Sequence, residues 1–238
     1  MTLKQKIIKW ISKQVKQAGS KGVVLGLSGG LDSAVSAALC AQALSKNKVL
    51  GLILLCSSQK EDLRDACLVA GKLKIRSKTV DLTGLYAKCL KILPRGSRLS
   101  CGNLKARLRM LVLYYFANSL DYLVCGTSNK SERLTGYFTK YGDGAADILP
   151  LGNLLKTQVK ELARSLNLPA KIINKAPTAG LWPGQTDEEE LGITYSQLDN
   201  ILSGRSSKIK SPSLIKKVRS RIQASEHKRQ LPKIFKIQ

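Results

Sequence analysis

Residues 26–33 read Gly26-Leu27-Ser28-Gly29-Gly30-Leu31-Asp32-Ser33. The apolar run Val23–Leu25 precedes this stretch, and a helical pattern from Ala34 to Leu44 follows it. A strand, a glycine-rich turn and a helix start form a typical phosphate-binding arrangement. Glycine lets the backbone approach an anion closely, and the helix N-terminus offers free N–H groups. The stretch therefore predicts a phosphate-binding loop at the end of the first strand.

The loop differs from a Walker A loop, because the pattern G-x-x-x-x-G-K-[ST] is missing. We expect Ser28, Ser33 and the glycine N–H groups to hold the phosphates, which leaves Asp32 free to bind a metal ion. The alternative is a plain turn in which Asp32 and Ser33 only begin a helix. The ordered string S-G-G-x-D-S after a buried strand is far rarer than a two-glycine turn, so it favours phosphate binding.

The length and composition indicate one globular α/β domain. The chain has 238 residues, a mass of 26.0 kDa and 43% hydrophobic residues, which suits a single domain over residues 1–238. No apolar run approaches the roughly 20 residues of a transmembrane helix. Residues 1–15 place Leu3, Ile7, Ile8, Ile11 and Val15 on one helical face, which predicts an amphipathic helix rather than a signal peptide. We therefore expect a cytoplasmic protein.

The net charge of +24 raises the question of a nucleic-acid partner. The basic residues are spread along the chain, and only the tail is enriched, with eleven Lys or Arg in residues 205–238 against the single acid Glu226. Few aromatic residues are interleaved for stacking on bases. Anionic small substrates or a generally basic proteome explain the charge equally well, so we do not expect a nucleic-acid partner.

The six cysteines lie far apart and form no C-x-x-C pair. This spacing fits neither a zinc site nor an iron–sulfur site. We expect reduced, buried thiols. The six are Cys40, Cys56, Cys67, Cys89, Cys101 and Cys125.

Strands and helices alternate along the first half of the chain. This alternation predicts a doubly wound parallel sheet that binds ligands at the carboxyl ends of its strands. The long helix is expected to bury Leu104, Leu108, Leu111 and Tyr115. We expect strands at 23–25, 49–55, 74–80 and 121–125, and helices at 34–44, 59–73, 103–117 and 156–166, with a further helix capped by Asp81 and ending near Leu93.

Six motifs accumulate along the chain. They are G-L-S-G-G-L-D-S from Gly26, G-N-L-K-A-R-L-R-M from Gly102, G-T-S-N-K-S-E from Gly126, G-Y-F-T-K-Y-G-D-G-A-A-D from Gly136, A-P-T-A-G-L-W-P-G-Q-T-D-E-E-E-L-G-I from Ala176 and E-H-K-R-Q from Glu226. The first resembles the signature of the PP-loop ATP pyrophosphatases, which cleave ATP between its α- and β-phosphates. Together the six resemble the short, ammonia-dependent NAD synthetases from about Val23 to Pro232.

The resemblance implies an α/β ligase, acting as a homodimer, that amidates deamido-NAD with ammonia and ATP. It implies Mg²⁺ ligands at Asp32 and Glu132, with these residues and Lys156 as the catalytic set. It implies ATP contacts at Gly26, Leu27, Ser28, Gly29, Gly30, Leu31, Asp32, Ser33, Thr127, Lys156 and Thr178. It also implies deamido-NAD contacts at Arg107, Lys140, Asp147, His227 and Lys228.

The chain departs from the family pattern at two places. Residues 55–58 stand where the family usually has a proline, so the adenine contacts stay open. The middle of G-T-S-N-K-S-E differs from that of longer members, so no ligand contact is transferred to residues 128–131. Nothing like a glutaminase region precedes the loop, and we therefore expect free ammonia, or a separate donor, to supply the nitrogen.

Two alternatives remain beside this interpretation. A PP-loop enzyme that modifies or binds RNA would suit the positive charge, but the chain has no C-x-x-C and no recognisable RNA-binding appendage. An inactive nucleotide-binding protein is disfavoured, because the two expected metal carboxylates, Asp32 and Glu132, are both present.

Overall fold

Four parallel strands form the central sheet of the computed structural model, which describes residues 1–182, 184–205, 209 and 211–235. The strand order is β3-β2-β1-β4, so the chain winds outward from β1 in one direction and then returns to its other side. This confirms the predicted doubly wound parallel sheet. The strands are β1 (Gly22–Gly26), β2 (Val49–Leu55), β3 (Arg76–Asp81) and β4 (Tyr122–Val124).

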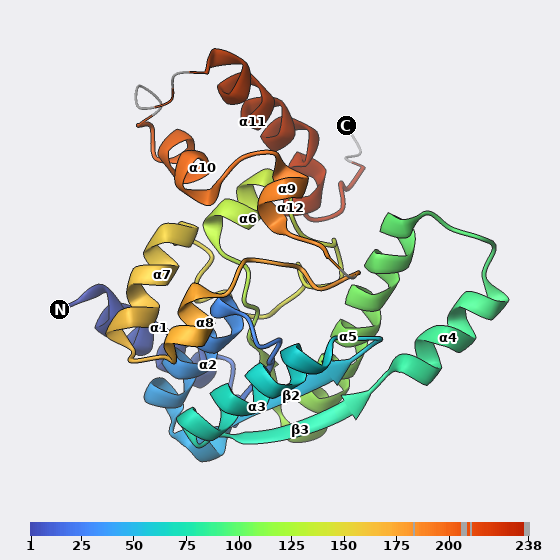
Figure 1. The fold of residues 1–238 in the computed structure, drawn as a ribbon. Helices are drawn as coiled ribbons and strands as arrows, with labels where there is room; N and C mark the ends of the chain where they lie inside the picture. Colours follow the sequence, from blue (N-terminus) through green and yellow to red (C-terminus); the bar gives the residue numbers. More distant parts are fainter. Residues whose placement is uncertain (183, 206–208, 210, 236–238) are drawn as a thin grey trace.

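Twelve α-helices surround the sheet or follow it within the described residues (Figure 1). They are α1 (Leu3–Gln17), α2 (Leu31–Leu44), α3 (Lys60–Leu73), α4 (Thr83–Ile92), α5 (Arg98–Leu120), α6 (Lys130–Thr135), α7 (Lys156–Ser165), α8 (Ala170–Asn174), α9 (Asp187–Leu191), α10 (Tyr195–Leu202), α11 (Pro212–Ala224) and α12 (Glu226–Arg229), with a short 3₁₀ helix at Lys46–Lys48. None of the helices in these described ranges combines the length and apolar character that a membrane crossing needs.

The two faces of the sheet carry separate hydrophobic cores. Successive side chains of a strand point to opposite faces, and β1 divides accordingly: Val23 and Leu25 pack in one core, and Val24 packs in the other. The first core also takes in α1, α2 and α7, and the second takes in α5. Helices therefore cover both faces, and the ligand-binding end of the sheet is its carboxyl edge.

A third core belongs to the C-terminal helices. It contains Leu191, Tyr195, Leu198 and Val218 from α9, α10 and α11. These helices lie apart from the sheet at the top of Figure 1, and α6 runs between them and the strands. Pro183 and residues 206–208, 210 and 236–238 of the loop and the basic tail lie outside the described residues.

The long helix α5 corrects one prediction. It begins at Arg98 rather than at residue 103, and it exposes Leu111 and Tyr115 to 64% and 68%. The residues that it buries against the sheet include Met110 and Leu113. Leu104 and Leu108 are half-buried, as expected of the inner side. The prediction for Leu111 and Tyr115 was wrong, because hydrophobicity alone does not distinguish a core stripe from an apolar stripe facing outward.

Smaller corrections concern the edge of the sheet. Asp81 ends β3 instead of capping a helix, although its carboxylate accepts the Thr83 N–H at 2.8 Å. Leu3 is exposed, whereas Ile7, Ile11 and Val15 are buried as expected. All six cysteines are free thiols, but Cys67 is exposed and only Cys40, Cys56 and Cys125 are buried.

An ion-pair network fastens the phosphate-binding loop to α3 and α8. Lys175 lies 2.7 Å from Asp65 and 2.9 Å from Asp62, and its ammonium group also donates to the Gly29 carbonyl at 3.4 Å. Lys171 lies 2.8 Å from the other Asp65 oxygen. Gly29 has φ +75°, and a Cβ there would lie 2.6 Å from the Asp62 carbonyl oxygen, so only glycine fits this contact.

The buried carboxylate of Asp65 is the centre of this network. Burial by itself would raise its pKa, but hydrogen bonds from Lys171 and Lys175 hold the pKa below its ordinary value. A lowered folded-state pKa means that the contribution to stability is fully present above about pH 4 and is lost as the pH falls through the folded-state pKa.

We expect Asp65→Asn to lower the free energy of unfolding by about 2 kcal/mol at pH 7, because it removes two charge-assisted contacts. Urea unfolding followed by circular dichroism measures this loss, and the difference from wild type should shrink as the pH is lowered from 5 to 3. The matched control is Glu61→Gln in the same helix. Its exposed carboxylate also pairs with Lys171, yet this substitution should change stability far less than Asp65→Asn does, because an exposed ion pair contributes little. Equal stabilities of wild type and Asp65→Asn at pH 7 would contradict the role given to Asp65.

Candidate functional site

The ammonium group of Lys156 lies between two carboxylates at the carboxyl edge of the sheet. Its Nζ is 2.5 Å from Asp32 Oδ2 and 3.2 Å from Glu132 Oε1. All three side chains are largely shielded from water. Asp32 lies in the first turn of α2, Glu132 in α6 and Lys156 at the start of α7. The structure thus brings together the three residues predicted to be catalytic.

The start of α6 fixes Glu132 and joins it to Asp32. Asn129 and Glu132 form a capping box, in which the Glu132 N–H donates to Asn129 Oδ1 at 3.0 Å and the Asn129 N–H donates to Glu132 Oε2 at 3.2 Å. The Asn129 amide nitrogen donates to Asp32 Oδ1 at 2.9 Å. Asn129 therefore orients both carboxylates, and no ligand contact had been predicted for it. The pattern N-x-x-E was the available signal in the sequence.

The charges in the site alter one another's proton affinity. Burial raises the pKa of the Glu132 carboxyl, Lys156 opposes the rise, and the nearby carboxylates of Asp32 and Asp187 add to it. Burial would lower the pKa of Lys156, but Asp32 and Glu132 raise it above its ordinary value. The Lys156 ammonium group also lies 5.0 Å from the centre of the Tyr195 ring. The raised pKa of Glu132 means that Lys156 does not fully compensate its carboxylate form, so a further cation beside the pair would favour that form.

The phosphate-binding loop lies where β1 passes into α2. The Leu27 N–H donates to the Leu52 carbonyl at 2.8 Å, and the Ser28 and Ser33 hydroxyls lie 3.0 Å apart. The Gly30 N–H donates to Ser28 Oγ at 3.2 Å. In the described chain, no side chain caps the N-terminus of α2. Its positive end therefore stays available to an anion, and phosphate binding by residues 26–33 stays a prediction.

A cleft of about 440 Å³ opens beside this loop. Its walls come from the segment after β2, from α3 and from the loop 176–186. Thr178, predicted to contact ATP, lies in this lining, and so do Ser57 and Ser58, whose ligand contacts the sequence left open. Thr127 follows β4, the strand next to β1, and is not part of the lining.

The first turns of α5 hold the loop 176–186 in place. Buried Lys105 donates to the Leu181 carbonyl at 3.0 Å, and the Arg98 guanidinium stacks 4.5 Å from the centre of the Trp182 ring. A Cβ at Gly102 would lie 3.1 Å from Trp182, so the missing side chain lets the loop approach the helix. These contacts hold Leu181 and Trp182 against α5, and Trp182 lines the cleft.

Four of the five residues predicted to contact deamido-NAD form a second group. The Arg107 guanidinium donates to the Lys140 carbonyl at 3.3 Å, and the Lys140 ammonium group donates to the His227 carbonyl at 2.6 Å. Lys228 donates to the Gly136 and Phe138 carbonyls at 2.8 and 3.0 Å. The tail thus closes on the segment 135–141, and Arg107 and His227 stay exposed while Lys140 is half-buried.

Asp147 lies away from these four. Its carboxylate accepts the Val124 N–H at 2.7 Å and the Tyr114 hydroxyl at 3.1 Å, so both oxygens stabilise the end of β4. Its predicted contact with deamido-NAD stays a prediction.

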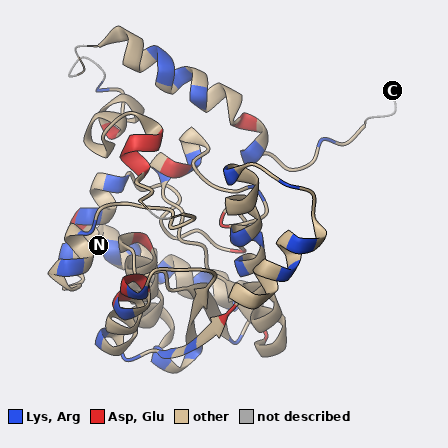
Figure 2. Cartoon of the chain, turned by 45° about the vertical axis from the view of Figure 1, so that its right-hand side comes forward, with Lys and Arg blue, Asp and Glu red and all other residues tan. Residues whose placement is uncertain are grey.

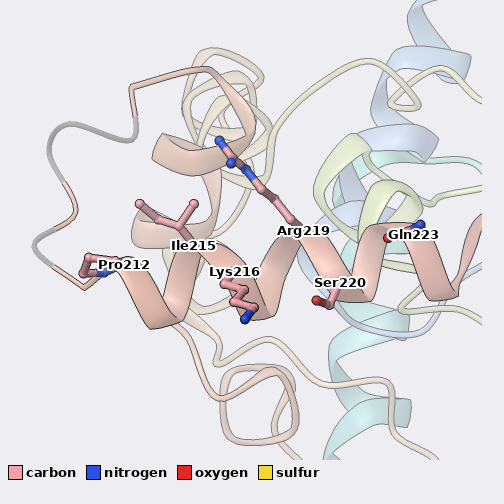
Figure 3. A pocket seen from close by; sticks show the side chains of 6 residues that line it. All are labelled: Pro212, Ile215, Lys216, Arg219, Ser220 and Gln223. Carbon is pink, nitrogen blue, oxygen red and sulfur yellow. The ribbon is translucent and has the colours of Figure 1, made fainter.

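Other surface features carry less chemistry. Lys and Arg are scattered over helices throughout the molecule (Figure 2), which matches the spread seen along the sequence. A hollow of about 500 Å³ runs along α11 between Pro212 and Gln223 (Figure 3), and Lys216 and Arg219 are its charged lining residues. It lacks the carboxylates that surround Lys156.

The residues present fit a divalent cation bound by few protein ligands. Among the described residues, no group of three or more His, Cys, Asp or Glu side chains could hold a metal by itself. Asp32 and Glu132 both reach the same ammonium group, so their oxygens converge on one region next to the phosphate-binding loop. Mg²⁺ is commonly bound by one or two carboxylates together with substrate phosphates, and this pair meets that requirement.

Comparisons with known proteins match nearly the whole chain. The family model for NAD synthase matches residues 3–232. The NH3-dependent NAD synthetase of Finegoldia magna is 47% identical over 230 residues, covering 96% of this chain and 93% of that protein. The solved structure of NMN synthetase from Francisella tularensis is 40% identical, with a TM-score of 0.92 over 99% of this chain and 98% of that one. The solved NH3-dependent NAD synthetase from Campylobacter jejuni is 34% identical, with a TM-score of 0.85 over 98% of each chain.

The match extends over nearly the whole chain, and the relatives share its fold. The motifs on which the resemblance was based lie at the carboxyl edge of the sheet, in the cleft wall and in the tail. The chain therefore belongs to the NAD synthase family.

Proposed function

We propose that this chain amidates deamido-NAD with ammonia, consuming ATP and releasing NAD, AMP and pyrophosphate. The observation that carries the proposal is the Lys156 ammonium group between Asp32 and Glu132, next to the loop of residues 26–33, in a member of the NAD synthase family. The alternative of an RNA-modifying enzyme loses support from this membership. The cytoplasmic location stays a prediction.

The first half-reaction is an adenylation. A carboxylate oxygen of the nicotinate group attacks the α-phosphorus of ATP, the bond to the bridging oxygen breaks, and pyrophosphate leaves with the electron pair. The α2 N-terminus and Lys156 stabilise the negative charge that builds on the leaving group. Mg²⁺ held by Asp32 and Glu132 would neutralise part of the same charge.

The second half-reaction makes the amide. Ammonia attacks the carbonyl carbon of the acyl-adenylate, a proton is lost to solvent, and AMP leaves. No side chain needs to form a covalent intermediate, which suits a site built from a lysine and two carboxylates. None of these three residues is a cysteine, and neither half-reaction needs a thiol nucleophile.

The group formed by Arg107, Lys140, His227 and Lys228 is our candidate for the dinucleotide site. Three basic side chains beside an exposed histidine suit a pyrophosphate-linked substrate. Their arrangement supports an account in which residues 1–238 act as one catalytic domain and the tail, residues 205–238, closes over the substrate.

A second candidate substrate follows from one comparison. The Francisella tularensis protein, which matches with a TM-score of 0.92, is an NMN synthetase. The same two half-reactions would convert nicotinate mononucleotide to NMN. The choice between mononucleotide and dinucleotide is therefore part of the test.

The exposed face of α5 supports a homodimer. Large apolar side chains are exposed on α4, α5 and the segment between them, and α4 and α5 project from the right of Figure 1. Exposed large apolar side chains on neighbouring elements favour an interface, and two-fold pairing of identical chains is the commonest way to cover them. The exposed residues are Leu85, Leu90, Ile92, Leu93, Leu99, Leu111 and Tyr115.

We expect purified protein supplied with ATP, Mg²⁺, ammonium and deamido-NAD to form one NAD and one AMP for each ATP. Chromatography of the nucleotides measures the ratio. Nicotinate mononucleotide replaces deamido-NAD in a parallel reaction, and faster amidation of it would favour the second candidate. Glutamine replaces ammonium as the control, and it should support turnover far more weakly. Release of ADP and orthophosphate would contradict the adenylation chemistry.

We expect Asp32→Asn or Glu132→Gln to lower the adenylation rate roughly a hundredfold, because each removes a charge from the metal pair while keeping the shape. The measurement is pyrophosphate release from ATP and deamido-NAD without ammonium. The matched control is Asp121→Asn, which alters an exposed carboxylate paired with Lys21 and should leave the rate unchanged. Adenylation at the wild-type rate in both site variants would show that the carboxylates are not metal ligands.

We expect Leu111→Asp combined with Tyr115→Asp to convert a dimer of about 52 kDa, twice the 26.0 kDa of one chain, into monomers. Two charges in an apolar contact would each remain unpaired on association. Analytical ultracentrifugation measures the mass. Leu68→Asp, which alters an exposed leucine of α3, is the control and should remain dimeric. A wild-type protein sedimenting at 26 kDa across the micromolar range would refute the dimer.

A further inference from the structure

A buried carboxylate from the C-terminal helices reaches the two helix starts that carry Glu132 and Lys156. Asp199 in α10 is 2% exposed. Its Oδ1 accepts the Ser131 hydroxyl at 2.5 Å, and its Oδ2 accepts the Thr157 N–H at 2.8 Å. The Ser131 hydroxyl oxygen also accepts the Lys156 N–H at 3.1 Å. One carboxylate thus connects the first turns of α6 and α7.

These contacts involve the residues that adjoin the catalytic pair in the sequence. Ser131 directly precedes Glu132, and Thr157 directly follows Lys156. Any shift of α6 relative to α7 would therefore stretch the Asp199 bridge and the contact of 3.2 Å between Lys156 and Glu132 together. The negative charge at two helix N-termini is favourable, because each carries the positive end of a helix dipole.

Other contacts attach the C-terminal helices to the rest of the molecule, so the Asp199 bridge is not required for that attachment. Their own core contains Leu198 and Tyr195 from α10 together with residues of α9 and α11. Arg229 of α12 further donates to the Leu134 carbonyl of α6 at 2.7 Å. The two oxygens of Asp199 instead point to the residues beside the catalytic pair.

We propose that Asp199 is a positioning residue, which sets the spacing of Glu132 and Lys156 through Ser131 and Thr157. Asp199 touches neither catalytic side chain. It holds the Glu132 carboxylate and the Lys156 ammonium group at a fixed distance from each other. The carboxylate then faces a metal ion, and the ammonium group faces the phosphates. This role rests on the proposed function, because it assumes that the pair acts on a metal–nucleotide complex.

The test compares Asp199→Asn with wild type in two measurements. Asparagine keeps the shape but removes the negative charge, and its amide retains only one of the two accepting oxygens. Outer-shell partners of metal ligands typically contribute 10- to 100-fold to metal affinity or activity. We expect kcat to fall by about that factor, and we expect the Kd for Mn²⁺ bound with α,β-methylene-ATP, measured by electron paramagnetic resonance without turnover, to rise about tenfold.

Two variants separate positioning from general destabilisation. Leu198→Ala removes a fully buried neighbour in the same helix that belongs to the C-terminal core. It should lower the Tm and leave the Mn²⁺–nucleotide Kd within about twofold, because it breaks no bond of the bridge. Ser131→Ala should reproduce the weaker binding of Asp199→Asn, and the double variant should be no weaker than either single one. Ser131→Ala also keeps the test decisive if Asp199→Asn does not fold.

The outcomes are distinct from those of the proposed function. Unchanged Mn²⁺–nucleotide binding in Asp199→Asn and Ser131→Ala, or equal weakening in Leu198→Ala, would overturn the positioning role. If wild type forms no amide but binds Mn²⁺–nucleotide, and both bridge variants weaken that binding, the positioning role stands and only the proposed reaction fails.

Discussion

The ammonium group of Lys156 and the two carboxylates around it place three charges where water has little access. Removing charges from water is costly, and the cost is recovered only when the groups are paired and well oriented. Asn129 and Asp199 supply that orientation, one from within the capping box of α6 and the other from α10. One ammonium group shared by two carboxyls leaves the pKa of Glu132 raised, so binding of a further cation would favour the ionised form of that side chain.

The winding of the sheet explains how this group can form. β1 and β4 are neighbours, although 95 residues lie between Gly26, which ends β1, and Tyr122, which begins β4, and the chain leaves β1 and β4 at the same edge. That edge is the switch point of a doubly wound sheet, where ligands usually bind. Asp32 follows β1 and Glu132 follows β4, so the topology itself brings the two carboxylates together.

Helix α5 links three parts of the proposed enzyme. Its first turns hold the loop that walls the cleft, through Lys105 and Arg98. Its middle carries Arg107, which lies beside Lys140, and its outer face exposes Leu111. Because a rigid helix moves as one body, a shift of α5 would change the cleft, the candidate dinucleotide site and the exposed apolar face together.

The sequence by itself determined the parallel sheet and the glycine-rich loop after β1, and it was enough to propose Asp32, Glu132 and Lys156 as the catalytic set, because these depend on local patterns and on motifs that each lie within a short segment. Only the tertiary structure decided which side of α5 faces the sheet, since an apolar stripe such as Leu111 and Tyr115 suits a core or a partner equally. It also decided the role of Asp199, whose contact with Ser131 spans 68 residues. Hydrogen bonds between distant segments leave no periodic trace in a sequence, because each partner is an ordinary polar residue until the fold brings the two together.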